Sequence, residues 1–218
     1  MESINTAFSI LILLSAIILM AGKRIKSYIS ALRLQAALIA AATLAVGISH
    51  LVEKGGFDLL IVTAVIVALK VFYIPRVLHR TWSAVEYRVE KDFFLNIPAL
   101  VLICCVIVVL TYFTLPDIPG LTSGPAGLLL VNSISLTLIG LFFIISRRKA
   151  IGQIVGLLVI ENGLFVTALF ASNGMPFIVD MGIFVDLITS VLILGIMVFR
   201  INDRFESIDI DKLNNLRG

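Results

Sequence analysis

Residues 151–171 read IGQIVGLLVIENGLFVTALFA and residues 178–199 read IVDMGIFVDLITSVLILGIMVF, and each segment carries an acidic side chain near its middle. Each segment has the length, about 20 mostly apolar residues, that crosses a bilayer as a helix. The two acidic residues are Glu161 and Asp186. An ionisable side chain at the centre of a membrane helix costs about 2.5–3.5 kcal/mol on insertion scales, so it is rare and usually functional. The two segments therefore predict consecutive membrane helices that carry a functional site.

The composition of the whole chain agrees with a membrane protein. Of its 218 residues, 60% are hydrophobic and 14% are charged, whereas about a quarter of the residues in soluble domains are charged. We therefore expect an all-α integral membrane protein with seven transmembrane helices. Their expected ranges are 4–22, 29–51, 57–78, 93–115, 126–146, 151–171 and 178–199. The first range is expected to be a retained helix, because basic residues follow it and do not precede it as they do in a signal peptide.

Basic residues predict the orientation of these helices. They cluster after the first, third and fifth segments and in the C-terminal tail, at Lys23, Arg24, Lys26, Arg76, Arg80, Arg88, Lys91, Arg147, Arg148, Lys149, Arg200, Arg204, Lys212 and Arg217. The connections on the opposite side carry Lys54 alone. Because loops rich in Lys and Arg stay in the cytoplasm, we expect an outside N-terminus and a cytoplasmic C-terminus. The expected location is the cell inner (cytoplasmic) membrane, as a multi-pass protein.

A loop rich in proline and glycine divides the chain. Residues 116–125 read PDIPGLTSGP, the strongest break in the sequence. We expect this segment to be an extended outer loop. It would separate a four-helix N-terminal half, residues 1–115, from a three-helix unit, residues 126–200. Residues 201–218 would form a cytoplasmic tail.

Three charged side chains are expected to share one layer in the middle of the membrane. At about 1.5 Å per helical residue, Lys70 lies about 12 Å, Glu161 about 15 Å and Asp186 about 20 Å from the cytoplasmic helix ends. A low dielectric disfavours each charged form and an opposite charge favours it, so such a set can exchange protons near neutral pH. The pattern indicates a proton relay. The alternative is a static charge pair that only fixes helix packing.

Other polar residues in the expected helices would extend such a relay. The secondary candidates are Asn162, Gln153, Ser190, Asn132, Ser133 and Arg33. Ser and Asn in membrane helices commonly make hydrogen bonds between helices, which is the alternative interpretation. For Arg33, about one turn from the boundary, the alternative is a side chain that extends to the lipid headgroups.

Several kinds of chemistry lack the residues they need. His50 and His79 lie near helix ends, so no bis-histidine haem pair spans the membrane. Cys104 and Cys105 are adjacent, which does not fit a metal or redox motif. The chain has no nucleotide-binding motif and no basic face interleaved with aromatics for nucleic acid. We therefore expect no catalytic residue, metal or cofactor in this chain, and no nucleic-acid partner.

A set of short motifs resembles a known family. They are Ser146-Arg147-Arg148-Lys149, Gly156, Glu161-Asn162-Gly163, Asp186, the ending at residues 208–218, and Lys70-Val71 followed by Pro75. Together they resemble hydrogenase-4 component E, a family of membrane subunits of energy-converting nickel–iron hydrogenases of the formate hydrogenlyase type. The last three helices of that family are similar to the K subunit of respiratory complex I and to the C subunit of multisubunit cation/proton antiporters.

The chain departs from the complex I subunit in one respect. The glutamates of the complex I helices align with Leu158 and Ser190, so each carboxylate here is displaced by three or four residues. Such a shift keeps roughly the same helix face. The resemblance therefore implies that the relay is retained at an altered depth.

The resemblance implies a non-catalytic, proton-translocating membrane subunit of a redox-driven ion pump. Glu161 and Asp186 would carry protons, and Lys70 would modulate them. The implied partners are antiporter-like membrane subunits, peripheral redox subunits and lipid, with the iron–sulfur clusters and the nickel–iron centre held by partner subunits. Two alternatives stay open: a subunit of a cation/proton antiporter and a purely structural linker.

Overall fold

The computed structural model describes residues 2–54, 56–83, 96–115, 125–147 and 150–171. Within these ranges the regular structure is helical: α1 Glu2–Ala21, α2 Ile25–Lys54, α3 Asp58–Ile66, η1 Val67–Tyr73, α4 Ile74–Ser83, α5 Ile97–Thr114, α6 Pro125–Ser146 and α7 Ala150–Ala171. By length and composition, six helical spans of the described residues can cross a membrane. This confirms an all-α integral membrane protein. The seventh expected helix, with Asp186 and Ser190, falls outside the described residues.

The third expected span is one continuous helical column built of α3, η1 and α4. Its middle part, η1, is a π-helix, in which the backbone hydrogen bonds reach one residue further than in an α-helix. The sequence predicts a helix over residues 57–78 and does not indicate its π-helical part. In the described residues the fourth span begins at Ile97, because the backbone of Asn96 is extended and Pro98 occupies the first turn; residues 93–95 of the expected range lie outside the described residues.

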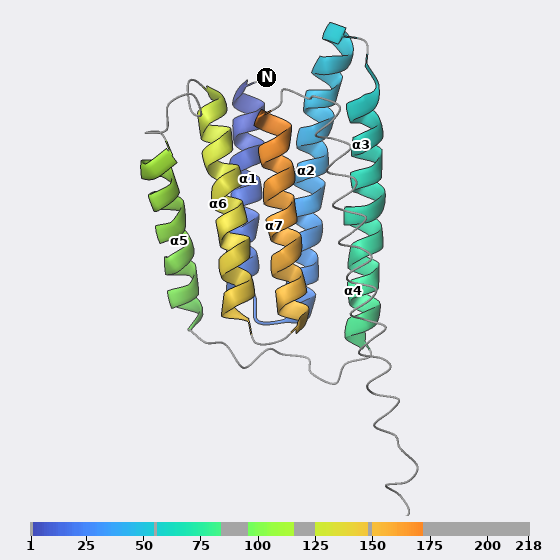
Figure 1. Cartoon of the computed structure of the whole chain (residues 1–218). Coiled ribbons are helices and arrows are strands. Elements are labelled where there is room, and N and C mark those ends of the chain that lie inside the picture. The colour runs from blue at the N-terminus through green and yellow to red at the C-terminus, as the bar shows by residue number, and fades with distance from the viewer. Residues whose placement is uncertain (1, 55, 84–95, 116–124, 148–149, 172–218) are drawn as a thin grey trace, which may run out of the picture.

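The helices stand side by side as a bundle (Figure 1). The pair α6 and α7 is central, and α1 packs against both α6 and α2. The column of α3, η1 and α4 lies against α2 at one edge, and α5 lies against α6 and α1 at the other. This order places the third span and α7 on either side of α2.

Glycines allow α6 and α7 to approach closely. A Cβ atom on Gly140 would lie 2.7 Å from the backbone nitrogen of Ile160, and one on Gly156 would lie 2.9 Å from that of Ile144. A Cβ on Gly163 would collide with Thr137. Small residues at membrane helix interfaces let backbones approach in this way. The contact holds α7 firmly and so fixes the position of Glu161.

The ends of α1 and α6 are joined by a buried arginine. Arg147 is 1% exposed, and its Nη2 donates to the carbonyl of Met20 at 3.1 Å. Its guanidinium carbon lies 4.3 Å from the ring centre of Phe143 and 5.2 Å from that of Tyr28. A cation at the C-terminal carbonyls of a helix is favourable. Arg147 therefore fastens the end of α1 to the end of α6.

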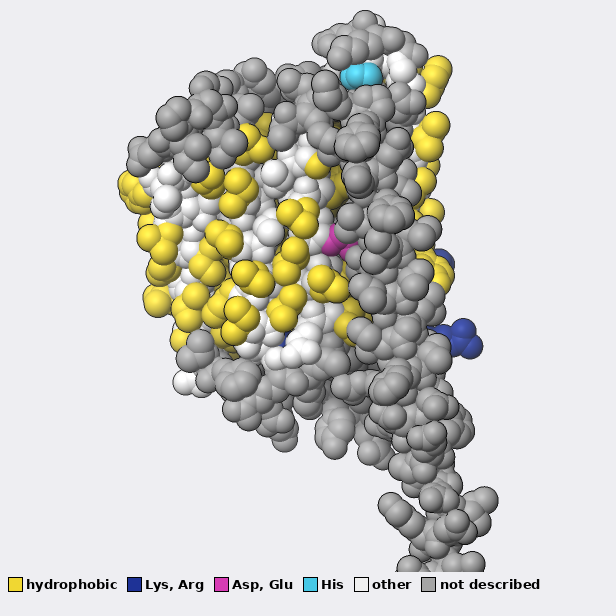
Figure 2. Space-filling model, in the orientation of Figure 1, with side chains coloured by type: hydrophobic (Ala, Val, Ile, Leu, Met, Phe, Trp, Pro, Cys, Tyr) yellow, Lys and Arg dark blue, Asp and Glu magenta, His cyan; other side chains and the backbone are white. Residues whose placement is uncertain are grey.

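The outward faces of the bundle are apolar. Figure 2 shows hydrophobic side chains spread over the visible face, with a small acidic patch at mid-height. Large exposed side chains include Leu102, Phe113, Ile145 and Ile18. Such a surface suits the hydrocarbon of a lipid bilayer.

Candidate functional site

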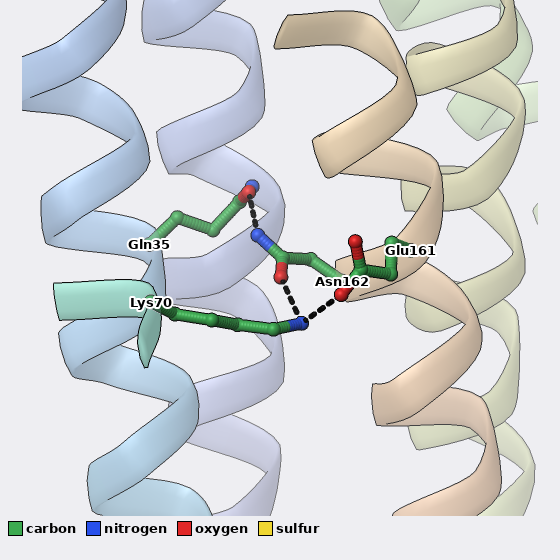
Figure 3. A network of polar contacts seen from close by, with 4 residues as sticks. All are labelled: Gln35, Lys70, Glu161 and Asn162. Carbon is green, nitrogen blue, oxygen red and sulfur yellow. Dashed lines mark hydrogen bonds and ion pairs between the residues drawn. The ribbon is translucent and has the colours of Figure 1, made fainter. Parts of the chain in front are cut away.

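A buried ion pair lies at the middle of the bundle. Lys70 Nζ of η1 is 2.8 Å from Glu161 Oε1 of α7, and the two side chains are 4% and 5% exposed. Residues 70 and 161 come from helices that lie on either side of α2. The extended Lys70 side chain bridges the distance, as Figure 3 shows. The structure thus brings together two charged residues that are 91 positions apart in the sequence.

Two amide side chains complete the cluster. Lys70 Nζ donates to Asn162 Oδ1 at 2.9 Å, and Asn162 Nδ2 donates to Gln35 Oε1 at 2.8 Å. Gln35 Nε2 lies 3.5 Å from the carbonyl of Ile12, a long contact to α1. An ammonium group only donates hydrogen bonds. The ammonium therefore orients the Asn162 amide, which in turn orients the Gln35 amide. Along this series of hydrogen bonds each donor points away from Lys70 (Figure 3).

The Glu161 carboxylate is held by charge. Among the described residues neither of its oxygens has a hydrogen-bond partner, although both are buried. Oε1 makes the ion pair with Lys70, and Oε2 has no such contact in the described part of the chain. The Lys70 ammonium also lies 5.6 Å from the ring centre of Phe165, whose face attracts cations. Glu161 is the only acidic residue whose side chain the structure describes.

The structure separates the expected site residues into two groups. Lys70, Glu161 and Asn162 meet in one cluster, as just described. Gln153 does not join it: its side chain is exposed and donates to the carbonyl of Arg147 at 3.3 Å. Arg33 is also exposed, and its Nε donates to the carbonyl of Val71 at 3.3 Å.

The expected polar residues of α6 serve helix contacts instead. Asn132 Nδ2 donates to Ser9 Oγ of α1 at 2.9 Å, and Ser133 Oγ accepts from Thr167 Oγ1 of α7 at 2.9 Å. In each case the partner lies outside the Lys70–Glu161 cluster. For these two residues the structure agrees with the alternative that the sequence left open, a hydrogen bond between helices.

Gln35 is the member of the cluster that the sequence analysis missed. Its side chain is completely buried, in the segment Leu32-Arg33-Leu34-Gln35-Ala36 of α2. The signal was an uncharged amide in an otherwise apolar membrane helix, which needs a hydrogen-bond partner in the protein.

The cluster combines a carboxylate, an ammonium group and two amides in the interior of the bundle. Glu161 and Lys70 carry opposite charges 2.8 Å apart, and each offsets part of the cost of burying the other. Asn162 and Gln35 are neutral amides, which hold the ammonium in place and do not readily take up protons. Within the described residues no three His, Cys, Asp or Glu side chains lie together as a metal site.

Comparisons with known proteins place part of the chain near one family. Residues 128–218 match the family described as NADH-ubiquinone/plastoquinone oxidoreductase chain 4L. The C-terminal part of the chain is similar to that family. This confirms the expected likeness to the complex I K subunit, and it supports a membrane subunit of a complex-I-like oxidoreductase with other membrane subunits beside it. The match does not test the likeness to hydrogenase-4 component E, which stays a prediction.

A second comparison covers nearly the whole chain. The chain is 26% identical over 222 residues to an uncharacterized protein, Rv0085, of Mycobacterium tuberculosis, across 98% of this chain and 99% of the relative. No solved structure matches the chain significantly. Glu161 and Asn162 lie inside the part similar to chain 4L, whereas Lys70 and Gln35 lie before it. The cluster therefore joins the 4L-like part to the N-terminal half.

Proposed function

We propose that this chain is a proton-translocating membrane subunit of a redox-driven ion pump of the energy-converting hydrogenase type. It performs no redox chemistry itself. Glu161 takes up and releases a proton during the cycle, Lys70 sets how readily it does so, and Asp186 is the second carrier on the following helix. The iron–sulfur clusters and the nickel–iron centre belong to partner subunits.

One observation carries the proposal, the buried pair of Lys70 and Glu161. Its atoms are 2.8 Å apart and its side chains are about 5% exposed or less. Charged residues inside membrane helices that pair with each other commonly mark proton pathways. That favours a group that changes protonation over one that only fastens helices.

The test is proton translocation by the assembled complex. Glu161→Gln removes the titrating group while keeping the shape, and Lys70→Met removes its partner. We expect Glu161→Gln to abolish proton translocation coupled to turnover in inverted membrane vesicles, and Lys70→Met to reduce it strongly. Asp186→Asn is expected to reduce it as well. Leu164→Ala, on the exposed face of α7, is the matched control. Coupled translocation at the control level in Glu161→Gln would leave the structural linker as the better account.

The subunits that co-purify with the chain test the identity of the complex. Affinity purification from native membranes should bring down antiporter-like membrane subunits together with peripheral redox subunits, including a hydrogenase large subunit. Recovery of antiporter subunits without any redox subunit would support a cation/proton antiporter and contradict the hydrogenase-type assignment.

A further inference from the structure

The π-helix η1 changes the register of the third span at the point where Lys70 lies. Before it, the N–H of Val67 bonds to the carbonyls of Ala64 and Thr63, three and four residues earlier. At its end, the N–H of Ile74 bonds to the carbonyl of Leu69, five residues earlier. In a π-helical segment each backbone hydrogen bond spans one residue more than in an α-helix. Since each α-helical residue turns by about 100°, the register of η1 decides which way Lys70 faces.

Pro75 removes one α-helical hydrogen bond next to this segment. Proline has no backbone N–H, so the carbonyl four residues earlier receives no α-helical hydrogen bond. That carbonyl belongs to Val71, the residue directly after Lys70. A carbonyl left without its helical partner in a membrane needs another donor.

Arg33 supplies that donor. Its Nε donates to the carbonyl of Val71 at 3.3 Å, from α2, the helix against which η1 packs. Two residues further along α2, Gln35 orients Asn162, which accepts from Lys70. One helix thus holds the Lys70 segment twice, through the backbone by Arg33 and through the side chain by Gln35.

We propose that Arg33 and Pro75 are positioning residues that hold η1 in its π-helical register and thereby direct Lys70 at Glu161. Without them, the Val71 carbonyl is free to bond to a backbone N–H at position 75, the segment closes into an α-helix, and the Lys70 ammonium turns away from the carboxylate. The importance of Arg33 and Pro75 for proton transport rests on the proposed function. Their effect on the direction of the Lys70 side chain does not depend on it.

The test measures the ion pair directly in the full-length protein. With lysine labelled in ¹⁵N and glutamate in ¹³C, solid-state NMR in lipid bilayers detects the contact between Lys70 Nζ and the Glu161 carboxyl carbon. Lys70→Ala assigns the signal and defines its background. The double variant Arg33→Ala/Pro75→Ala removes the external donor and restores the N–H at position 75. We expect the contact to fall to the Lys70→Ala background in this variant.

Matched controls separate a change in the helical register of η1 from a general effect of removing an arginine and a proline. Arg76→Ala/Pro98→Ala removes an exposed arginine from the same column and a proline from the first turn of α5, and we expect it to keep the contact. Pro75→Ala alone leaves Arg33 in place and should weaken the contact partly, and Arg33→Lys with Pro75 intact should keep it. These two variants give the answer if the double variant does not fold.

The outcomes are distinct. Full contact in a folded Arg33→Ala/Pro75→Ala variant, or in Pro75→Ala if only that variant folds, would overturn the proposal. So would equal loss in the Arg76→Ala/Pro98→Ala control. If the contact is lost but the assembled complex still translocates protons at the wild-type rate, Arg33 and Pro75 keep their positioning role and the proposed function of the pair fails instead.

Discussion

Asn162 Nδ2 donates a hydrogen bond to Gln35 Oε1 at 2.8 Å, and this contact between α7 and α2 fixes the direction of the Asn162 amide. The oxygen of Asn162 is thereby turned toward Lys70 Nζ, 2.9 Å away. The Gln35 side chain has no exposed surface, so its amide requires a partner inside the bundle. The two amides together hold an ammonium group in the interior of a membrane protein.

Removal of the Gln35 amide should destabilise the bundle. Gln35→Met leaves the Asn162 amide nitrogen buried without its acceptor, at a cost of about 1–3 kcal/mol. Unfolding of the purified protein in mixed detergent micelles measures the loss. The control is Gln153→Met, because Gln153 is exposed, and it should change stability by less than about 0.5 kcal/mol. Equal losses in the two variants would contradict a structural role for the Gln35–Asn162 bond.

The Lys70–Glu161 pair should show strong coupling in a double-mutant cycle. Lys70→Met leaves a buried carboxylate without its cation and should cost about 3–5 kcal/mol. Adding Glu161→Gln removes the stranded charge, so we expect the double variant to be more stable than Lys70→Met alone. The same unfolding measurement gives the coupling energy. Strictly additive effects would mean that the two groups do not interact as their 2.8 Å separation implies.

Arg147 should matter for stability far more than its neighbours in the basic clusters. Arg147→Ala removes a buried charged hydrogen bond to Met20, worth about 1.5–3 kcal/mol, and the contacts with the rings of Phe143 and Tyr28. Arg24→Ala removes the same charge from an exposed side chain, so both variants alter the loop charge equally. A stability loss confined to Arg147→Ala is the expected result. A similar loss of stability in Arg147→Ala and Arg24→Ala would mean that the loop charge, which sets membrane orientation, causes the loss, and not the packing of Arg147.

The glycine contact between α6 and α7 should not tolerate a methyl group. In Gly140→Ala the new Cβ would lie 2.7 Å from the backbone of Ile160, which cannot move as a flexible side chain would. Overpacking of this kind costs about 1–3 kcal/mol, and thermal unfolding measures it. Ala37→Val enlarges an exposed side chain of α2 and should have little effect. Unchanged stability in Gly140→Ala would show that the two helices pack less closely than the 2.7 Å distance implies.

Much of the architecture follows from hydrophobicity alone. The expected ranges 126–146 and 151–171 agree closely with α6 and α7, because an apolar segment of about 20 residues has few alternatives in a membrane. Lys70 and Glu161 were expected at a similar depth for the same reason: helical rise converts position in the sequence into depth. Depth alone could not predict that Lys70 and Glu161 are in contact, because it does not show which helices are neighbours.

Other features depend on packing that hydrophobicity does not encode. The contact between the Val71 carbonyl and Arg33 joins residues that are 38 positions apart in the sequence. Hydrophobicity could not predict this contact or the π-helix η1 beside it. Arg147 was counted among the loop charges that set orientation, yet it is buried against the rings of Tyr28 and Phe143, because the ends of α1 and α6 meet there. Gln153 was a relay candidate from its position on α7, and only the structure shows that it bonds to the Arg147 carbonyl. Asp186 and Ser190 lie outside the described residues, so their roles stay predictions.

The central claim is that Glu161 changes its protonation state while the complex works. Infrared difference spectroscopy on the assembled complex, comparing resting and turning-over states, measures this most directly, with Glu161→Gln to assign the band. The account predicts that a protonated-carboxyl band appears or disappears during turnover in the wild type and is absent from the Glu161→Gln difference spectrum. A Glu161 carboxylate band that stays constant through turnover, in a complex that pumps protons, would contradict it.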